Sequence, residues 1–423
     1  ESHLLRSKTN DSADDYQRTT VYISHEFGHQ WFGNLVTPAW WDYIWIGESF
    51  AAYFQYHTAD VVQPTWKLKE QFVIDVVQEA FRKEERYGAH PLNYKIQYSG
   101  QYPPFHIMYE KGSTIVRMME HFLSPEVFRK GLNIYLTKNK YGAAYPSDLY
   151  NALQEAVDKA NANHLLNNMP VNEIMETWDS TKGFPIVTVT RDYETGSVTI
   201  TQKSKFDANT KWKIPINFVS SSDKNIDFSE TTADLWLTED SIVVNRNLST
   251  DGWLLVNKQQ TGYYRVNYDR ENWERIIDFM TTDKFKSIHL LNRAQLLEDA
   301  FYFAYSGGLS WDIPLKLGDY IKQERDYIAL AAFHNALDNY LLIHGEWYYE
   351  SRKAKDSVVF QNHTLINTVD SDATEFDLHK AYVKSVLGDV IAHLGTSSRE
   401  SDTHLDKLTR SKLIGYHYTY LSR

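Results

Sequence analysis

The chain has 423 residues, a formal net charge of −11, 42% hydrophobic residues and no cysteine. Its length is sufficient for two or three domains with cores of their own, which excludes a small isolated binding module. The acidic balance, with no Lys/Arg-rich stretch to reverse it, argues against a nucleic-acid partner, and the lack of cysteine excludes disulfides, thiolate metal sites and a cysteine nucleophile.

The spacing of apolar residues predicts three regions in chain order. Residues 15–180 have mostly helical spacing, with Ser147 placed as the N-cap of one helix. From Pro185 the apolar period changes to two, and seven or so short strands follow over about 85 residues, which favours a small β-sandwich. Helical spacing resumes at Asn272 and persists nearly to the end, interrupted by residues 351–376, which we expect to form a long exposed connection. The predicted fold class is multidomain α+β.

An H-E-x-x-H motif, formed by His25, Glu26 and His29, lies in a run that should be helical until Gly33 and Asn34 stop it. At about 100° per residue, His29 lies about 40° around the helix from His25, and Glu26 lies about 60–100° from either. The two imidazoles and the carboxylate therefore share one helix face. Zinc fits such a face, with two imidazole nitrogens as ligands and the carboxylate beside the metal to handle a bound water.

A third ligand is required, because a catalytic zinc site has three protein ligands and an open fourth position. Glu48 follows His29 with eighteen residues between them, at the beginning of an apparent second helix. Packing of that helix on the first would bring its carboxylate to the metal, and Gly28 is expected to make room for the close packing. The alternative is structural: His25 and His29 would be core histidines bonded to backbone, and Glu48 a solvated carboxylate that suits the helix dipole.

Residues 25–51 resemble the zinc signature of the gluzincin aminopeptidases, specifically the aminopeptidase N family, and most of all its insect membrane-bound members; their sequence is HEFGHQWFGNLVTPAWWDYIWIGESFA. Tyr109, in the segment YEKGS, falls where that family carries its catalytic tyrosine. Further matching segments follow in the family's order: GFPIVTV at 183–189, TGYYRVNYD at 261–269 and LNRAQLLEDAF at 291–301. The resemblance covers essentially the whole chain.

The resemblance implies three domains. Residues 1–183 would be the later, mostly helical part of a thermolysin-like catalytic domain that holds the zinc site, residues 184–269 a β-sandwich, and residues 270–423 the start of a solenoid-like α-helical C-terminal domain. The family's N-terminal β domain and its G-x-M-E-N strand, whose glutamate binds the free α-amine of the substrate, are absent from this sequence. We therefore expect the chain to be a fragment of a longer protein.

The resemblance also implies a function: a zinc-dependent metallo-aminopeptidase, of EC 3.4.11 type, that hydrolyses N-terminal residues from peptides. One Zn²⁺ per chain would be held by His25, His29 and Glu48, with Glu26 as the general base and Tyr109 as a donor to the developing oxyanion. The expected partners are peptide substrates and no nucleic acid.

The implied location is the extracellular face of the plasma membrane or the secreted fraction. Three N-x-[ST] triplets, at Asn10, Asn247 and Asn362, agree with a glycoprotein in such a location. Any membrane attachment would use segments absent from this chain, because no stretch here approaches the ~18 consecutive apolar residues of a membrane span.

Two residues depart from the family pattern N-E-G-F-A around the third ligand, since this chain has Gly47 before Glu48 and Ser49 after it. They motivate an alternative, a catalytically impaired relative that acts as a cell-surface binding or receptor protein. A third hypothesis, an endopeptidase of thermolysin type, agrees with the zinc site alone but not with the β-sandwich and the helical tail.

Overall fold

The structure of the protein is a computed structural model that describes residues 4–7, 11–245, 250–342, 353–361, 363–370 and 372–421. The asparagines of the three N-x-[ST] triplets, Asn10, Asn247 and Asn362, lie outside the described residues. The chain divides into two compact units, Glu1–Tyr268 and Asp269–Arg423. The three-domain division expected from the sequence remains a prediction.

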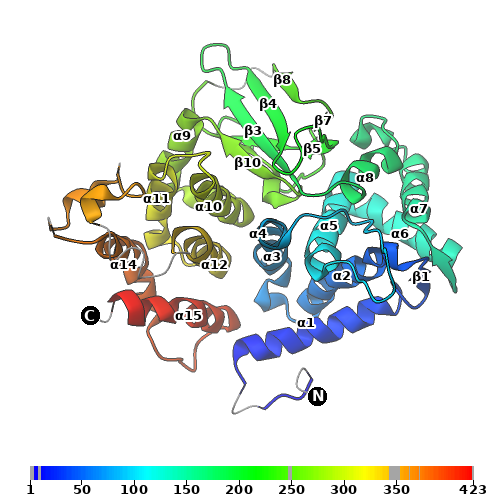
Figure 1. The fold of residues 1–423 in the computed structure, drawn as a ribbon, viewed down its shortest axis with the longest axis horizontal. Coiled ribbons are helices and arrows are strands. Elements are labelled where there is room, and N and C mark those ends of the chain that lie inside the picture. Colours follow the sequence, from blue (N-terminus) through cyan, green and yellow to red (C-terminus); the bar gives the residue numbers. More distant parts are fainter. Residues whose placement is uncertain are drawn as a thin grey trace. The chain divides into compact units, whose positions relative to one another are not determined.

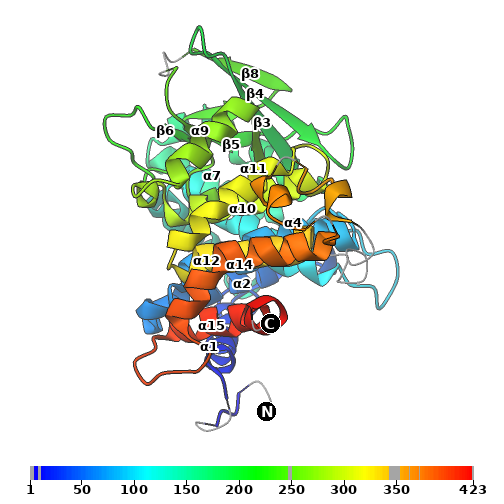
Figure 2. The ribbon, with the colours of Figure 1, turned by 90° about the vertical axis from the view of Figure 1, so that its left-hand side faces the viewer.

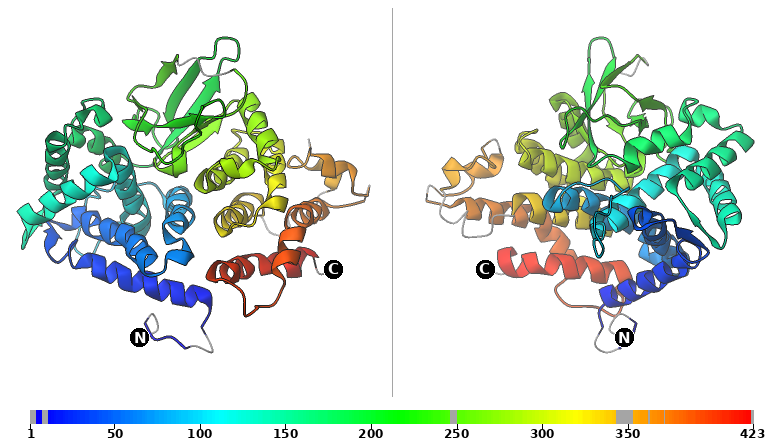
Figure 3. Two further views of the ribbon diagram at one scale, coloured as in Figure 1. Left: turned by 180° about the vertical axis from the view of Figure 1, so that it is seen from behind. Right: turned by 45° about the vertical axis from the view of Figure 1, so that its right-hand side comes forward.

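The first part of the first unit is helical, as predicted. Its helices are α1 (Ala13–His29), α2 (Trp45–Val62), α3 (Leu68–Phe72), α4 (Gln78–Tyr87), α5 (Gly112–Leu123), α6 (Pro125–Asn139), α7 (Pro146–Lys159) and α8 (Val171–Asp179) (Figure 1). α1 begins with a capping box. The side chain of Ser12 accepts a hydrogen bond from the main-chain N–H of Asp15, and the side chain of Asp15 accepts one from the main-chain N–H of Ser12. α1 packs along α2, and this pairing of the two blue helices is also visible from behind (Figure 3).

Two helix ends differ from the prediction. α7 is capped by Tyr145 and not by Ser147, because Pro146 begins the helix: proline has no N–H to satisfy, and its φ suits the first helical position. α1 ends at His29, four residues before Gly33, which adopts φ +131° and turns the chain toward the first strand.

Strands fill the second part of the first unit: β3 (Pro185–Arg191), β4 (Val198–Ser204), β5 (Ile214–Ile216), β6 (Phe218–Ser220), β7 (Leu235–Leu237), β8 (Ser241–Val244), β9 (Leu254–Val256) and β10 (Arg265–Tyr268). They form a four-stranded sheet in the order β10-β3-β4-β8 and two ladders, β5-β7 and β6-β9. β10 is parallel to β3, and the other pairs are antiparallel. In β3, Val187 and Val189 are buried while Thr190 is exposed, which confirms the predicted period of two. Elsewhere, β1 (Val36–Pro38) and β2 (Gly142–Ala144) form a short parallel pair.

The second unit is helical, as the apolar spacing after Asn272 predicts. Its helices are α9 (Arg270–Met280), α10 (Leu290–Tyr305), α11 (Asp312–Gly318), α12 (Tyr327–Ala336), α14 (Glu375–Leu394) and α15 (His404–Tyr416) (Figure 2). α10 packs against α12, with the rings of Phe301 and Phe333 in edge contact at 6.0 Å. None of the helices that the structure describes, in either unit, combines the length and the apolar character needed to span a membrane.

The expectation of a long exposed connection at residues 351–376 is confirmed in part: many of the described residues there are exposed and only short 3-10 turns precede α14, but a few buried side chains anchor the segment. Phe360 is fully buried, and its ring meets the rings of His379 and Tyr382 on α14. Ser357 is also buried and donates a hydrogen bond to Glu375, in the first turn of α14. Because most of the segment is polar, the sequence did not indicate that Phe360 packs against α14 and attaches the segment to that helix.

Candidate metal centre

The three predicted ligands lie together where α1 meets α2. His25 and His29 project from α1, and Glu48 projects from the first turn of α2. Oε2 of Glu48 is 3.5 Å from Nε2 of His25 and 3.3 Å from Nε2 of His29. Two ligands of a tetrahedral zinc site with bonds of about 2.05 Å are about 3.3 Å apart, so the spacing matches that of a metal site. Across the described part of the chain, no other group of His, Asp or Glu side chains converges in this way.

Close packing of the two helices produces this convergence. A β-carbon at Gly28 would lie 3.0 Å from Cα of Ala51, which is tighter than an ordinary contact, so glycine favours the close approach of α1 to α2, as the sequence predicted. Four residues after Gly28, beyond the end of α1, the ring of Phe32 stacks on that of Phe50 at 4.5 Å. The contact between the helices therefore holds the histidines opposite the carboxylate.

The Glu48 carboxylate has the properties of a metal ligand. Its Oε2 atom is buried, and among the described residues no hydrogen bond of ordinary geometry satisfies it. Burial raises the pKa of Glu48, but the His25 and His29 imidazoles and the Tyr109 hydroxyl outweigh that effect, so the pKa lies far below its usual range. A buried, ionised oxygen facing two imidazole nitrogens fits a divalent cation.

Each imidazole is held by a hydrogen bond on its far side. His25 Nδ1–H donates to Oε1 of Gln55 at 3.0 Å, and His29 Nδ1–H donates to the main-chain oxygen of Phe32 at 2.9 Å. With the proton on Nδ1, Nε2 of each ring, which lies on the side of Glu48, has its lone pair available to bind a metal ion. The sequence analysis missed Gln55; its position seven residues after Glu48, two helical turns along α2, was the available signal.

Tyr109 also lies at the cluster. It belongs to η4 (Ile107–Lys111), a π-helical turn that leads into α5, and its ring centroid is 5.8 Å from that of His25. Burial, and then the charge of Glu48, raise the pKa of Tyr109 above its ordinary value. The hydroxyl therefore keeps its proton at neutral pH and can act as a hydrogen-bond donor.

Glu26 lies beside His25 on α1 and is exposed, so a bound molecule could reach it. The pKa of His29 is raised mainly by Glu48, with smaller contributions from the Phe32 main-chain oxygen and from the charge of Glu26, while burial opposes them. Glu26 also contributes to the raised pKa of Tyr109. The Glu26 carboxylate is thus close enough to interact electrostatically with both His29 and Tyr109.

The two departures from the family pattern are accommodated without disturbing the cluster. Gly47 is buried, and a β-carbon there would make only ordinary contacts, the closest at 3.5 Å from Pro38. Ser49 is fully buried, and its hydroxyl donates to the main-chain oxygen of Met108 at 2.7 Å. Neither residue displaces Glu48 from the histidines.

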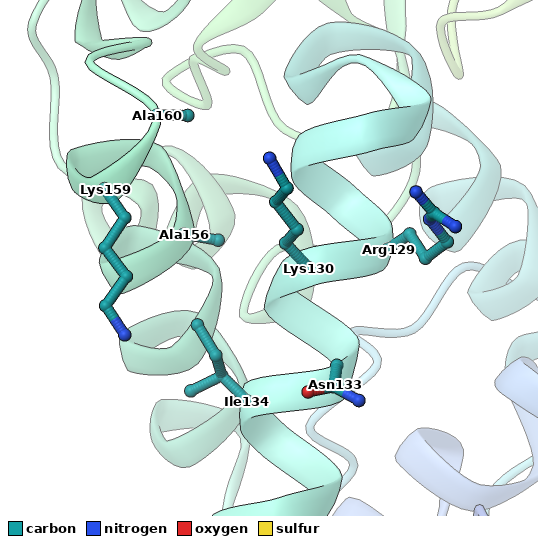
Figure 4. A pocket seen from close by; sticks show the side chains of 7 residues that line it. All are labelled: Arg129, Lys130, Asn133, Ile134, Ala156, Lys159 and Ala160. Atoms are coloured by element: carbon teal, nitrogen blue, oxygen red, sulfur yellow. The ribbon is translucent and has the colours of Figure 1, made fainter.

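A separate hollow lies between α6 and α7 and offers different chemistry (Figure 4). It is lined by Arg129, Lys130, Asn133, Ile134, Ala156, Lys159 and Ala160. No imidazole or carboxylate is among these residues, and Lys130 and Lys159 already pair with Glu126 and Glu155. This hollow supplies neither metal ligands nor a general base.

Comparisons with known proteins agree with the site's chemistry. Residues 1–178 match the peptidase family M1 domain, and residues 253–419 match the ERAP1-like C-terminal domain. The chain is 42% identical to an aminopeptidase N of Plutella xylostella, over 75% of this chain and 34% of the relative. It is 33% identical to aminopeptidase N of Rattus norvegicus, over 81% of this chain and 36% of the relative, and 27% identical to glutamyl aminopeptidase of Rattus norvegicus, over 98% and 40%. The chain thus spans about a third of the length of these relatives.

Proposed function

The chain belongs to peptidase family M1, a family of metallopeptidases, and from this premise we propose that it carries the zinc centre of an aminopeptidase that removes N-terminal residues from peptides. The observation that carries the proposal is the spacing of 3.3 Å and 3.5 Å between Glu48 Oε2 and the two histidine Nε2 atoms. Two nitrogens and one carboxylate oxygen are a ligand set that zinc prefers, and three protein ligands leave a fourth position open. One Zn²⁺ per chain is held by His25, His29 and Glu48.

The residues around the ligands have distinct roles in peptide hydrolysis. When bound, zinc supplies an acidified water and polarises the scissile carbonyl. The exposed Glu26 carboxylate takes a proton from the attacking water and returns it to the leaving amine. The protonated Tyr109 hydroxyl donates a hydrogen bond to the oxygen of the scissile carbonyl as negative charge develops there, an interaction worth about 2.7–4 kcal/mol in comparable sites.

The proposal extends to the architecture and location of the parent protein. Residues 1–183 are the later part of a thermolysin-like catalytic domain, 184–269 a β-sandwich and 270–423 part of an α-helical, solenoid-like domain. The substrates are peptides at the extracellular face of the plasma membrane or in the secreted fraction, in line with a 32% identical relative, the thyrotropin-releasing hormone-degrading ectoenzyme of Rattus norvegicus. The alternative of a catalytically silent receptor has no support in the names of the relatives.

The decisive experiment measures zinc content and aminoacyl-anilide hydrolysis in the longest natural form of the protein. His25→Ala and Glu48→Ala are expected to lose zinc and activity together. Glu26→Gln is expected to retain stoichiometric zinc while hydrolysis falls by about 10²–10⁴-fold, because only the proton-transfer group is removed. Wild-type protein that folds without binding zinc, or a Glu26→Gln variant with wild-type activity, would overturn the proposal.

A further inference from the structure

Gln55 is the side chain that holds the first histidine of the cluster. It lies on α2, seven residues after Glu48, and Oε1 is 3.0 Å from Nδ1 of His25. Residues seven apart on a helix lie on the same face, so the same side of α2 carries Glu48 and the partner of His25. Gln55 itself is half-buried, which limits the competition of water for this contact.

The two imidazoles are supported in different ways. His29 donates to a main-chain oxygen, that of Phe32, only three residues further along its own chain segment. His25 donates to a side chain on another helix. The orientation of His29 is therefore determined by the local backbone, whereas the orientation of His25 depends on the identity of one residue that can be substituted.

The chemistry of the amide determines what this contact does. An amide oxygen is only an acceptor, so the His25 ring must carry its proton on Nδ1, which leaves the lone pair of Nε2 for a metal ion. Without an acceptor at this place, the ring could adopt the other tautomer or rotate, and either change would remove the lone pair from the cluster. Contacts of this kind alter metal affinity by about 10–100-fold in proteins.

We propose that Gln55 is a positioning residue for zinc, which fixes the tautomer and ring orientation of His25. The inference rests on the proposed metal centre, but it concerns a residue that does not touch the metal. Because the acceptor is a neutral amide, a carboxylate can replace it without loss of the hydrogen bond, whereas an aliphatic side chain of similar length cannot.

The test measures zinc dissociation constants by chelator competition at one fixed pH, in the longest natural form of the protein. Gln55→Leu is expected to bind zinc about 10–100-fold more weakly than wild type, and Gln55→Glu is expected to bind at least as tightly as wild type. Gln55→Met, which has an unbranched side chain, is measured as well, because a folding defect caused by the branched leucine could by itself weaken zinc binding. Gln30→Leu is the matched control, because Gln30 follows His29 directly and is exposed; it is expected to bind zinc as wild type does.

A second readout separates positioning from packing. In zinc-free protein labelled with ¹⁵N-histidine, the Nδ1–H signal of His25 is expected in wild type and in Gln55→Glu and is expected to be lost in Gln55→Leu and Gln55→Met. Equal zinc affinity in wild type, Gln55→Leu and Gln55→Met would overturn the inference while leaving the metal centre intact. Equal weakening in Gln55→Glu and Gln55→Leu would also overturn it, because that result indicates packing alone. Wild type that binds no zinc would refute the proposed function and this inference with it.

Discussion

Ser49 donates a hydrogen bond of 2.7 Å to the main-chain oxygen of Met108, the residue that precedes Tyr109. The contact joins the helix that carries Glu48 to the π-helical turn that carries the tyrosine. Gly112 completes the contact, because a β-carbon there would lie 1.8 Å from Oγ of Ser49. Ser49, which departs from the family pattern, therefore fits because the residue that faces it, Gly112, has no side chain.

This complementarity predicts an asymmetric response to substitution. Gly112→Ala is expected to lower the free energy of unfolding by about 1–3 kcal/mol, since the new methyl group overlaps the Ser49 hydroxyl. Ser49→Gly alone removes the hydrogen bond and is expected to cost about 1 kcal/mol. In the double variant Ser49→Gly/Gly112→Ala the overlap is gone, so the loss should be smaller than the sum of the two single losses. Urea denaturation gives the three values, and strictly additive losses would contradict the packing described here.

A buried ion pair lies two residues after Tyr109. Lys111 and Glu84 are both fully buried, with Nζ 2.9 Å from Oε1, and Lys111 also donates to the main-chain oxygens of His90 and Gly183. Tyr263 donates to the other oxygen of Glu84 at 2.8 Å. Burial lowers the pKa of Lys111, and the neighbouring Glu84 opposes that shift.

Lys111→Met is expected to reduce the free energy of unfolding by about 3–5 kcal/mol, because it leaves the Glu84 charge buried without its partner. The matched control is Lys130→Met, which breaks an exposed pair with Glu126 and should change stability by no more than about 0.5 kcal/mol. Chemical denaturation of the two variants measures the difference. A similar effect of both substitutions would show that burial of the Lys111 pair has no energetic consequence.

Local patterns in the sequence were sufficient to predict the side chains that converge at the candidate metal centre, but not the residues that hydrogen-bond to them. His25, Glu26 and His29 share a helix face whatever that helix packs against, so helical geometry alone predicts them. Glu48 required only that a second helix follow and pack on the first. Gln55 and the Phe32 oxygen could not be predicted in this way, because their contacts depend on how far α2 is rotated and shifted relative to α1.

The same limit explains the errors in the fold. The periods of 3.6 and two identify the helical and strand regions because burial of one face acts along a whole element. The N-cap of α7 is Tyr145 and not Ser147 because of one proline, Pro146. Phe360 is buried within a polar segment because its ring packs on His379 and Tyr382, which are distant in the sequence. Single contacts that lack a repeated pattern leave no periodic signal.

Acid is expected to destabilise the second unit through His379. This residue on α14 is fully buried, and burial lowers its pKa from 6.5 to about 4. As pH falls below 6.5, the unfolded state binds a proton that the folded state does not, so the free energy of unfolding decreases until the pH approaches 4. At pH 5 the loss from this one residue is about 2 kcal/mol relative to pH 7.5.

Hydrogen exchange in peptides from α14, corrected for the intrinsic dependence on pH, measures this loss as a fall in opening free energy. His379→Gln should show a smaller difference between pH 7.5 and pH 5 than wild type does. His393→Gln, at an exposed position on the same helix, is the control and should retain the wild-type difference. If the two variants respond to pH identically, His379 is not the source of the acid sensitivity.

The close approach of α1 and α2 predicts opposite results for one substitution at two helical glycines. Gly388→Ala in α14 places the new methyl group in open space, with no atom within 4 Å, and should gain about 0.5–1 kcal/mol from helix propensity. Gly28→Ala places it 3.0 Å from Cα of Ala51, where the backbone cannot yield, so the helices must separate and stability should fall. Because one helix carries the two histidines and the other carries Glu48, that separation should also weaken zinc binding. Urea denaturation measures the stability of each variant, and chelator competition measures its zinc affinity. If Gly28→Ala is stabilised as Gly388→Ala is and its zinc affinity is unchanged, the helix contact does not set the geometry of the metal centre.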